Sequence, residues 1–357
     1  MPSLDENAYY NTVDLPVYYN ELEEYLPETV LDFHTHVWLK EHFRVIPWAE
    51  GVPGGSYMIV ATDYGFEALQ EHGNRFFPTR RYEAVCFGYP APTGNIEASN
   101  AYVSQGGGHP GMYPLMVQRK DSTPREVIRE QLQAGSFFGY KVATPWQGDD
   151  YGNVTIEDML GEAAMEVANE QELVVLLHLP RSGRMADPVN IKGLQRLAKA
   201  YPQAQIVLAH CGRCYCPGLM QKGIGALKDL ENLYFDVSMV QDPVVLQILF
   251  DHVSSSRVFF ATDLPVAAMR GRRVCVNDHW VDVVREPSQG SAFRISSETL
   301  NATFMAYEIA RAVRDAALLV GLSRQELRSV FYDNGMALLG RVTQGKTLQG
   351  VRKQERP

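Results

Sequence analysis

His34 and His36 are separated by a single residue in the stretch TVLDFHTHVW, residues 29–38. Residues two apart on a β-strand project from the same face, so these two imidazoles can bind one metal ion, at about 2.0–2.1 Å per nitrogen for zinc. The residues just before them form a short, β-prone run. We therefore expect the pair to lie where a buried strand ends, which is where α/β barrels carry their active sites.

Three further β-prone runs end in a residue that can bind a metal. The runs at 173–177, 205–209 and 257–262 are followed by His178, His210 and Asp263. A single histidine at the end of a buried strand is usually a core residue. Four strands of one chain with the same kind of ending indicate a shared site instead.

The composition is that of a globular enzyme or carrier. The chain has 357 residues, of which 45% are hydrophobic and 21% are charged, and its net charge is −9. The negative charge argues against a nucleic-acid partner. No stretch approaches the roughly 20 apolar residues of a membrane helix, and the acidic N-terminus lacks the apolar region of a signal peptide. We expect a cytoplasmic protein with a small-molecule substrate and no membrane partner.

Short β-prone runs alternate with segments of helical periodicity along the chain. Beyond the four strands above, further strands are predicted at 81–87, 112–117, 138–143 and 233–237. Helices are predicted at 95–103, 124–133, 155–170, 188–200, 217–230, 243–252, 297–320 and 323–339. Eight strands that alternate with helices imply parallel strands joined by right-handed crossovers.

This alternation fits either a barrel or an open doubly wound sheet. The first strand is not followed by Gly-x-Gly-x-x-Gly, which many open sheets carry. The ligand-type residues follow strands one, five, six and eight, whose ends converge only in a barrel. We predict an α/β fold, a (β/α)8 TIM barrel over residues 29–340, with an N-terminal extension (1–28) and a C-terminal tail (341–357). The long segment 264–296 is interpreted as a lid or as a contact in a homodimer.

The chain resembles the metal-dependent amidohydrolase superfamily, in the amidohydrolase-2 branch that includes aminocarboxymuconate semialdehyde decarboxylase. The resemblance covers about residues 28–340 and is carried by Asp32-x-His34-x-His36, Phe138-Gly139-Tyr140-Lys141, His178, His210 with Gly212, Thr262-Asp263-x-Pro265 and residues 334–340 (NGMALLG). It implies one divalent metal ion, zinc with manganese as the alternative, bound by His34, His36, His178 and Asp263. His210 would lie beside the metal as an acid/base or a substrate-polarising group.

Lys141 allows a different metal count. In binuclear members of the superfamily, a carboxylated lysine at this place bridges two metals, and His178 and His210 would then both bind the second metal. The branch resembled here is mostly mononuclear, so one metal is the favoured interpretation. A substrate contact or a plain strand-end lysine are the other interpretations of Lys141.

Three more residues are candidates for binding substrate. Arg181 and Arg213 each follow a candidate histidine by three residues, and either could hold a substrate carboxylate; a solvated loop arginine is the equal alternative. Trp146 could line the pocket. The cluster Cys211, Cys214 and Cys216 is interpreted as reduced thiols rather than as part of a disulfide framework.

These residues favour a metal-dependent hydrolase in which a metal-bound water cleaves an amide, ester or lactone bond of a small carboxylate-bearing substrate. A divalent ion lowers the pKa of bound water to about 7, Asp263 can accept its proton, and His210 can stabilise developing charge. Non-oxidative decarboxylation by the same branch is the first alternative. A non-catalytic metal-binding barrel is the second.

Overall fold

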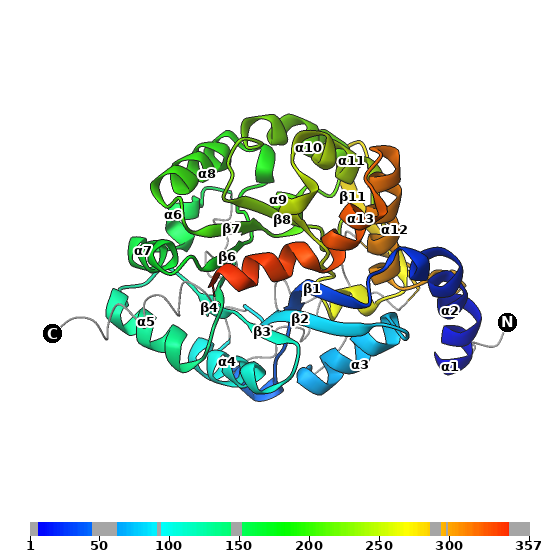
Figure 1. The fold of residues 1–357 in the computed structure, drawn as a ribbon, viewed down its shortest axis with the longest axis horizontal. Coiled ribbons are helices and arrows are strands. Elements are labelled where there is room, and N and C mark those ends of the chain that lie inside the picture. Colours follow the sequence, from blue (N-terminus) through cyan, green and yellow to red (C-terminus); the bar gives the residue numbers. More distant parts are fainter. Residues whose placement is uncertain are drawn as a thin grey trace.

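The computed structural model describes residues 6–44, 63–90, 94–143, 152–285, 294–297 and 299–342. Its centre is a barrel made of two parallel sheets, of three and six strands, with helices on the outside (Figure 1). The strands are β1 Thr29–His36, β2 Arg81–Phe87, β3 Met112–Pro114, β4 Met116–Gln118, β5 Gly139–Val142, β6 Val174–Leu177, β7 Gln205–Leu208, β8 Leu233–Asp236 and β9 Val258–Phe259.

The order of the strands is that of a (β/α)8 TIM barrel, as predicted. All neighbours from β1 to β3 and from β4 to β9 pair in parallel. The predicted strand 112–117 is interrupted at Leu115, whose N–H donates to the carbonyl O of Cys86 at 2.9 Å. On the other side of the barrel, the N–H of Phe33 in β1 donates to the carbonyl O of Phe260, just after β9, at 3.0 Å.

Burial on both faces explains why these strands read as continuous apolar runs. Every residue of β6 and β7 is buried, and their sequences are VVLL and QIVL. Strands of parallel sheets covered by helices have this composition because neither face meets water.

Helices of the outer layer follow most of the strands. They are α3 Phe66–Phe76, α4 Ile96–Val103, α5 Arg125–Ala134, α6 Ile156–Met159, α7 Glu162–Glu170, α8 Pro188–Ala200, α9 His210–Arg213, α10 Pro217–Gly223, α11 Pro243–His252, α12 Met305–Leu319 and α13 Arg324–Phe331. Two of them start in the same way: Asp187 and Asp242 accept hydrogen bonds from backbone N–H groups of α8 and α11, and a proline follows each cap. This is a favourable helix start, because the proline needs no N–H partner there.

Four predicted helices have different bounds in the structure. The one predicted at 155–170 is broken into α6 and α7 by a turn at Leu160 and Gly161. The one predicted at 217–230 ends at Gly223 and continues as a 3-10 turn. The one predicted from 297 starts at Met305, and the one predicted at 323–339 breaks at Tyr332, where the backbone leaves helical φ and ψ. Periodicity alone does not reveal such local breaks.

The N-terminal segment packs on the barrel rather than extending from it. It begins with α1 Glu6–Tyr9 and α2 Leu15–Val17, and Glu21 further along pairs with Arg311 of α12. The buried carboxylate of Asp14 lies 2.7 Å from the guanidinium of Arg270, and Arg270 also pairs with Glu6 at 2.8 Å. Because Asp14 is fully buried, this pairing fixes the segment against the region after the last barrel strand.

The segment 264–296, predicted as a lid or a dimer contact, contains regular structure. β10 Gly271–Val276 and β11 His279–Val284 form an antiparallel hairpin, and β12 Arg294–Ser296 pairs in parallel with β11. Its role as a lid or dimer contact stays a prediction.

A disulfide joins this hairpin to the barrel. Cys216 is bonded to Cys275 of β10, with the two Cα atoms 5.7 Å apart. The prediction that Cys216 is a reduced thiol is therefore wrong. The partner lies 59 residues further along the chain, in a segment whose fold could not be deduced, so spacing did not reveal it. Cys211 and Cys214 are free and buried, as is Cys86.

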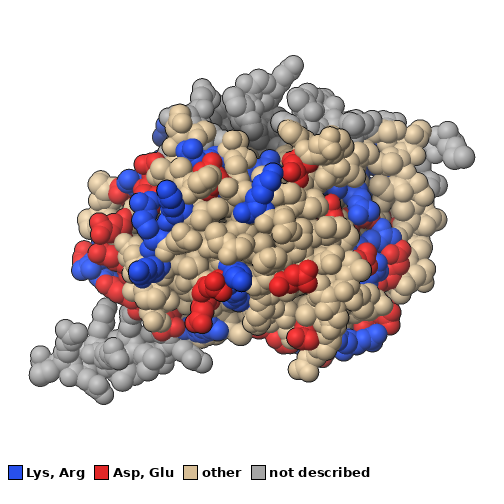
Figure 2. Space-filling view, turned by 90° about the horizontal axis from the view of Figure 1, so that it is seen from above, with Lys and Arg blue, Asp and Glu red and all other residues tan. Residues whose placement is uncertain are grey.

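The helix lengths and the surface charges bear on the predicted partners. Among the described residues, no helix is both long and apolar enough to span a bilayer. On the face shown in Figure 2, basic and acidic side chains are interspersed among uncharged ones.

Candidate metal centre

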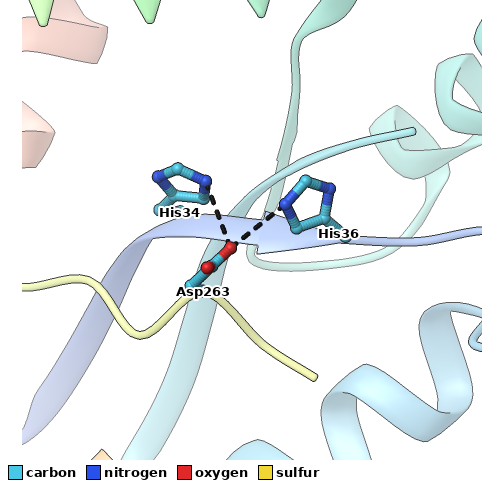
Figure 3. Close-up of side chains that lie close together, drawn as sticks. All are labelled: His34, His36 and Asp263. Atoms are coloured by element: carbon cyan, nitrogen blue, oxygen red, sulfur yellow. Dashed lines mark hydrogen bonds and ion pairs between the residues drawn. The ribbon is translucent and has the colours of Figure 1, made fainter. Parts of the chain in front are cut away.

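The ends of the first and last barrel strands bring three donor groups together. His34 and His36 lie at the end of β1, and Asp263 follows β9. The Oδ1 atom of Asp263 lies 3.1 Å from Nε2 of His36 and 3.4 Å from Nε2 of His34 (Figure 3). One donor atom from each residue lies within 4.8 Å of the other two. The side chain of Asp263 is 17% exposed, so the group is open on one side.

A fully buried carboxylate couples the two segments that carry these donors. Oδ1 of Asp32 accepts from the backbone N–H of His34 at 3.2 Å and of Thr262 at 2.9 Å. Its Oδ2 accepts from the Thr262 hydroxyl and from Tyr82. Burial raises the pKa of Asp32 to about 7, although these hydrogen bonds oppose the shift. Asp32 thus fixes β1 relative to the residue that precedes Asp263.

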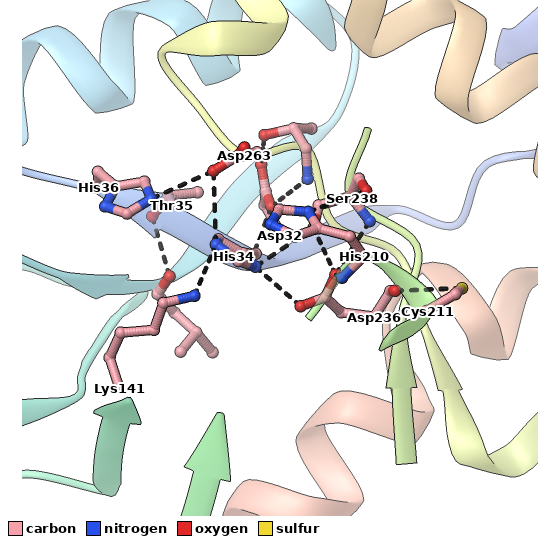
Figure 4. Close-up of polar contacts among 12 residues, drawn as sticks. Asp32, His34, Thr35, His36, Lys141, His210, Cys211, Asp236, Ser238 and Asp263 are labelled. Atoms are coloured by element: carbon pink, nitrogen blue, oxygen red, sulfur yellow. Dashed lines mark hydrogen bonds and ion pairs between the residues drawn. The ribbon is translucent and has the colours of Figure 1, made fainter. Parts of the chain in front are cut away.

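Asp236, at the end of β8, orients the imidazole of His34. Its Oδ2 lies 2.8 Å from Nδ1 of His34. Because a carboxylate can only accept, Nδ1 must carry a proton, and Nε2 keeps its lone pair for a metal or a proton. Lys141 already approaches that lone pair, with Nζ 3.0 Å from Nε2 (Figure 4).

The backbone and the ring of His210 are held by different partners. Its backbone N–H donates to Oδ1 of Asp236 at 2.8 Å. Nδ1 of His210 lies 3.1 Å from the carbonyl O of Ser238, which can only accept, so Nδ1 carries the proton. The Nε2 atom of His210 is therefore an acceptor in the neutral ring. The ring lies against that of His34, with centroids 4.8 Å apart.

Asp236 is better suited to positioning than to binding a metal. His34, His210 and Asp236 do form a second group of close donors. However, Oδ1 of Asp236 also accepts from the N–H and the hydroxyl of Ser238, and Oδ2 is bonded to His34. Both oxygens are thus already used by the protein, as in carboxylates that support metal-binding histidines.

His178 lies beside these residues but outside both close groups. Its ring is T-shaped to that of His210, with centroids 5.4 Å apart. Its backbone N–H donates to the carbonyl O of Val142 at 2.9 Å. The charges of His210, Lys141 and His36 act on its pKa, so it faces the same space. Its role as a metal ligand stays a prediction.

The burial of the site favours neutral imidazoles and a charged aspartate. Desolvation lowers the pKa of His34, His178 and His210. Desolvation acts in the opposite sense on Asp263, but the hydrogen bond from His36 and the nearby imidazoles hold the pKa of its carboxyl far below the usual range. Burial lowers the pKa of Lys141 to about 8, although the charges of Asp236 and Asp263 oppose it.

The loops that leave the strands carry backbone strain. Non-glycine residues with φ between +50° and +70° follow β6, β7, β8 and β9, namely Arg181, Arg184, His210, Cys211, Arg213, Met239 and Asp263. Such residues cluster at functional sites, where the surrounding structure holds them. Next to His210, Gly212 has φ 67°, and a Cβ there would lie 2.8 Å from the Cβ of Met185. A side chain at this position would clash with Met185.

The donor set suits a divalent ion. Two imidazole nitrogens and one carboxylate oxygen are ligands that zinc and manganese accept, and the carboxylate behind His34 is the usual support of such a ligand. Nε2 of His36 donates to Asp263, and the buried Nδ1 has no hydrogen-bond partner. A bound ion would take the place of the proton on Nε2. His34, His36 and Asp263 are therefore the residues that would hold the ion.

The predicted substrate-binding residues have different surroundings. Arg181 is paired with Asp187, with Nε 3.0 Å from Oδ1. Arg213 donates to the carbonyl O of Leu179 at 3.0 Å. Trp146 lies outside the described residues. Sequence reasoning missed Asp236 and Ser238, although β8 was predicted at 233–237 and its end could have been examined as the other strand ends were.

Comparisons with known proteins identify the family of this chain. The amidohydrolase family model matches residues 31–341, and the chain belongs to this family. An amidohydrolase from Burkholderia multivorans with bound zinc has 13% identity and a TM-score of 0.57, covering 87% of this chain and 99% of that one. No curated protein matches the sequence.

Two other similar structures carry names of different reactions. A putative 2-pyrone-4,6-dicarboxylic acid hydrolase from Pseudomonas putida has 18% identity and a TM-score of 0.52, with 88% of this chain and 99% of that one covered. A 5-carboxyvanillate decarboxylase from Novosphingobium aromaticivorans with bound manganese has 12% identity and a TM-score of 0.55, with 87% and 97% covered. At these identities the likeness shows the fold alone.

Proposed function

We propose that this protein is a metal-dependent hydrolase that cleaves an amide, ester or lactone bond of a small, carboxylate-bearing substrate. The observation that carries the proposal is the approach of Asp263 Oδ1 to Nε2 of both His34 and His36, beside His210. We propose zinc as the ion, with manganese as the alternative. When bound, such an ion supplies Lewis acidity, which polarises a carbonyl and activates water.

Asp263 and His210 would move the protons. The pKa of Asp263 is low, so its carboxylate is ionised at neutral pH and can accept a proton. Its Oδ1 is engaged with the two histidines, while Oδ2 has no hydrogen bond to a described residue. We therefore assign the proton transfer to Oδ2: it takes a proton from water and returns it to the leaving group.

We propose a more limited role for His210 than the acid/base or substrate-polarising role that the sequence predicts. With its proton held on Nδ1 by Ser238, neutral His210 presents only a lone pair at Nε2. Stabilising an oxyanion needs a donor at this atom, and burial disfavours the protonated ring. We propose that His210 accepts a proton or binds the metal ion through Nε2. We propose that the protonated Nζ of Lys141, which lies 3.0 Å from Nε2 of His34, supplies the positive charge.

Decarboxylation is the second candidate. It is favoured by the similar structures named as decarboxylases, among them a 2,6-dihydroxybenzoate decarboxylase from Rhizobium. The third interpretation, a non-catalytic metal-binding barrel, fits less well, because structural zinc sites are closed and Asp263 remains 17% exposed.

A screen can separate the candidates. Metal-loaded protein is offered lactones, esters, amides and aromatic carboxylic acids, with acid release and CO2 release recorded side by side. Hydrolysis should release acid without CO2, and Asp263→Asn should lower kcat by a factor of roughly 100 or more, as expected for loss of acid–base catalysis. CO2 release alone would transfer the proposal to decarboxylation. No turnover of any class with bound metal would favour the non-catalytic barrel.

A cytoplasmic location and the absence of nucleic-acid and membrane partners stay predictions. The Cys216–Cys275 disulfide argues against a reducing compartment, because disulfides are rare there.

A further inference from the structure

Arg184 differs from Arg181 and Arg273 in its partners. Arg181 is paired with Asp187. Arg273 of β10 makes two bonds to Asp282, of 2.7 and 3.0 Å, with both side chains almost fully buried. Among the described residues, Arg184 has no carboxylate partner. Its Nη1 donates to the carbonyl O of Arg213 at 3.2 Å, and its buried Nε has no hydrogen bond. Arg184 therefore keeps N–H donors that no described residue uses.

Tyr215 lies next to this guanidinium. The Cζ of Arg184 is 5.4 Å from the centre of the Tyr215 ring, and the ring is only 8% exposed. No described residue forms a hydrogen bond to its hydroxyl. That hydroxyl is not sealed in the core, whereas the hydroxyls of Tyr140 and Tyr307 are. Tyr215 therefore offers a second unused donor close to Arg184.

Both side chains face the candidate metal centre. The ring of Tyr215 lies 5.8 Å from that of His210, centroid to centroid. The guanidinium of Arg184 lies against the same Tyr215 ring and donates to the carbonyl O of Arg213, three residues after His210. The unused donors and the metal centre thus share one space.

Contacts with the β10–β11 hairpin hold Tyr215 in place. Arg273 lies 4.3 Å from its ring centre and 4.0 Å from that of Trp280, and the rings of Tyr215 and Trp280 are T-shaped at 5.5 Å. Cys216, the next residue, is bonded to Cys275 of the same hairpin. A side chain fixed by packing and a covalent link loses little entropy when it binds a ligand.

We propose that Arg184 and the hydroxyl of Tyr215 form the subsite that binds a carboxylate of the substrate, with the β10–β11 hairpin as its supporting wall. The guanidinium provides a charged, planar donor set that matches a carboxylate, and the phenol adds a directional hydrogen bond. This inference rests on the proposed function and narrows its substrate to a molecule whose carboxylate is bound on the β6–β7 side, away from the reacting bond. Arg181, already paired with Asp187, is not part of the subsite.

Binding measurements test the subsite without any turnover. Calorimetry of zinc-loaded protein is run with isophthalate as the probe and with isophthalamide as its uncharged match. Arg184→Gln should weaken isophthalate binding by roughly 10-fold or more, since it removes a charged hydrogen bond. Tyr215→Phe keeps the ring and should weaken binding by roughly 3-fold to 10-fold. Arg181→Gln is the matched control and should change the Kd by less than about 2-fold.

Two results would overturn the subsite. One is an unchanged Kd for isophthalate in Arg184→Gln while the variant keeps the circular dichroism and metal content of the wild type. The other is equal binding of isophthalate and isophthalamide by the wild type, or binding of neither. Because no reaction is measured, a protein that fails every hydrolysis assay but loses isophthalate binding in Arg184→Gln would still have the subsite.

Discussion

Nδ1 of His34 lies 2.8 Å from Oδ2 of Asp236, and this contact decides which nitrogen of His34 faces the candidate metal centre. The other oxygen of Asp236 accepts from the backbone N–H of His210 at 2.8 Å. One buried carboxylate therefore orients the imidazole of His34 and fixes the backbone that carries His210.

Loss of this carboxylate should weaken metal binding. In Asp236→Asn, the amide cannot accept from both histidines with the strength of a charged group, so we expect the affinity for zinc to fall by roughly 10-fold to 100-fold, as for other supporting residues of metal sites. Competition with a chromogenic chelator measures it. Asp251→Asn, an exposed position on α11, is the control. A zinc affinity equal to that of the control would show that Asp236 does not support His34.

Asp32 should be important for stability as well as for the site. Asp32→Ala leaves the hydroxyls of Thr262 and Tyr82 and the N–H of Thr262 without their acceptor in the core. Each unsatisfied buried donor costs about 1–3 kcal/mol, so we expect a loss of about 3 kcal/mol or more in the free energy of unfolding. Guanidinium denaturation measures it, with Asp251→Ala beside it. A loss below about 1 kcal/mol would contradict this network.

The state of Lys141 distinguishes a site with one metal ion from a site with two. Its Nζ lies 3.0 Å from Nε2 of His34 and its pKa is lowered to about 8, so a neutral amine is accessible near neutral pH. If Lys141 is an unmodified neighbour of a single ion, Lys141→Met should retain about one equivalent of metal. Elemental analysis of both proteins and the intact mass of the wild type provide the test. Two equivalents in the wild type that fall in the variant, with an added carboxyl mass, would establish a bridge instead.

The disulfide should be detectable and stabilising. Alkylation of unfolded, unreduced protein should label three cysteines, and five after reduction, because only Cys216 and Cys275 are paired. For a loop of 59 residues, the chain-entropy model gives a stabilisation of about 4 kcal/mol. Cys275→Ser and reduced wild type should lose similar stability, and a reductant should not destabilise Cys275→Ser further. Five labelled cysteines without reduction would refute the disulfide.

The sequence was sufficient to predict the barrel and the meeting of His34, His36 and Asp263, for a physical reason. Residues that end parallel strands must meet at one mouth, so His34, His36 and Asp263 could be brought together without coordinates. The bounds of helices were less predictable, since the break at Gly161 depends on local backbone geometry.

Other features depended on contacts between segments far apart in the chain. Arg184 and Tyr215 lie 31 positions apart (215 − 184) and carry no motif. That Arg184 lacks a carboxylate partner among the described residues can be recognised only when the partners of Arg181 and Arg273 are known. The disulfide to Cys275 belongs to the same class, because the hairpin that carries it was predicted only as a long segment.

The central claim is that His34, His36 and Asp263 hold a divalent ion. Elemental analysis of protein purified without added metal tests it most directly, with Asp263→Asn and the control Asp251→Asn beside the wild type. We predict about one equivalent of zinc or manganese in the wild type and in the control, and a clear loss in Asp263→Asn. Absence of metal from the wild type, with no uptake on reconstitution, or full retention by Asp263→Asn, would contradict the account.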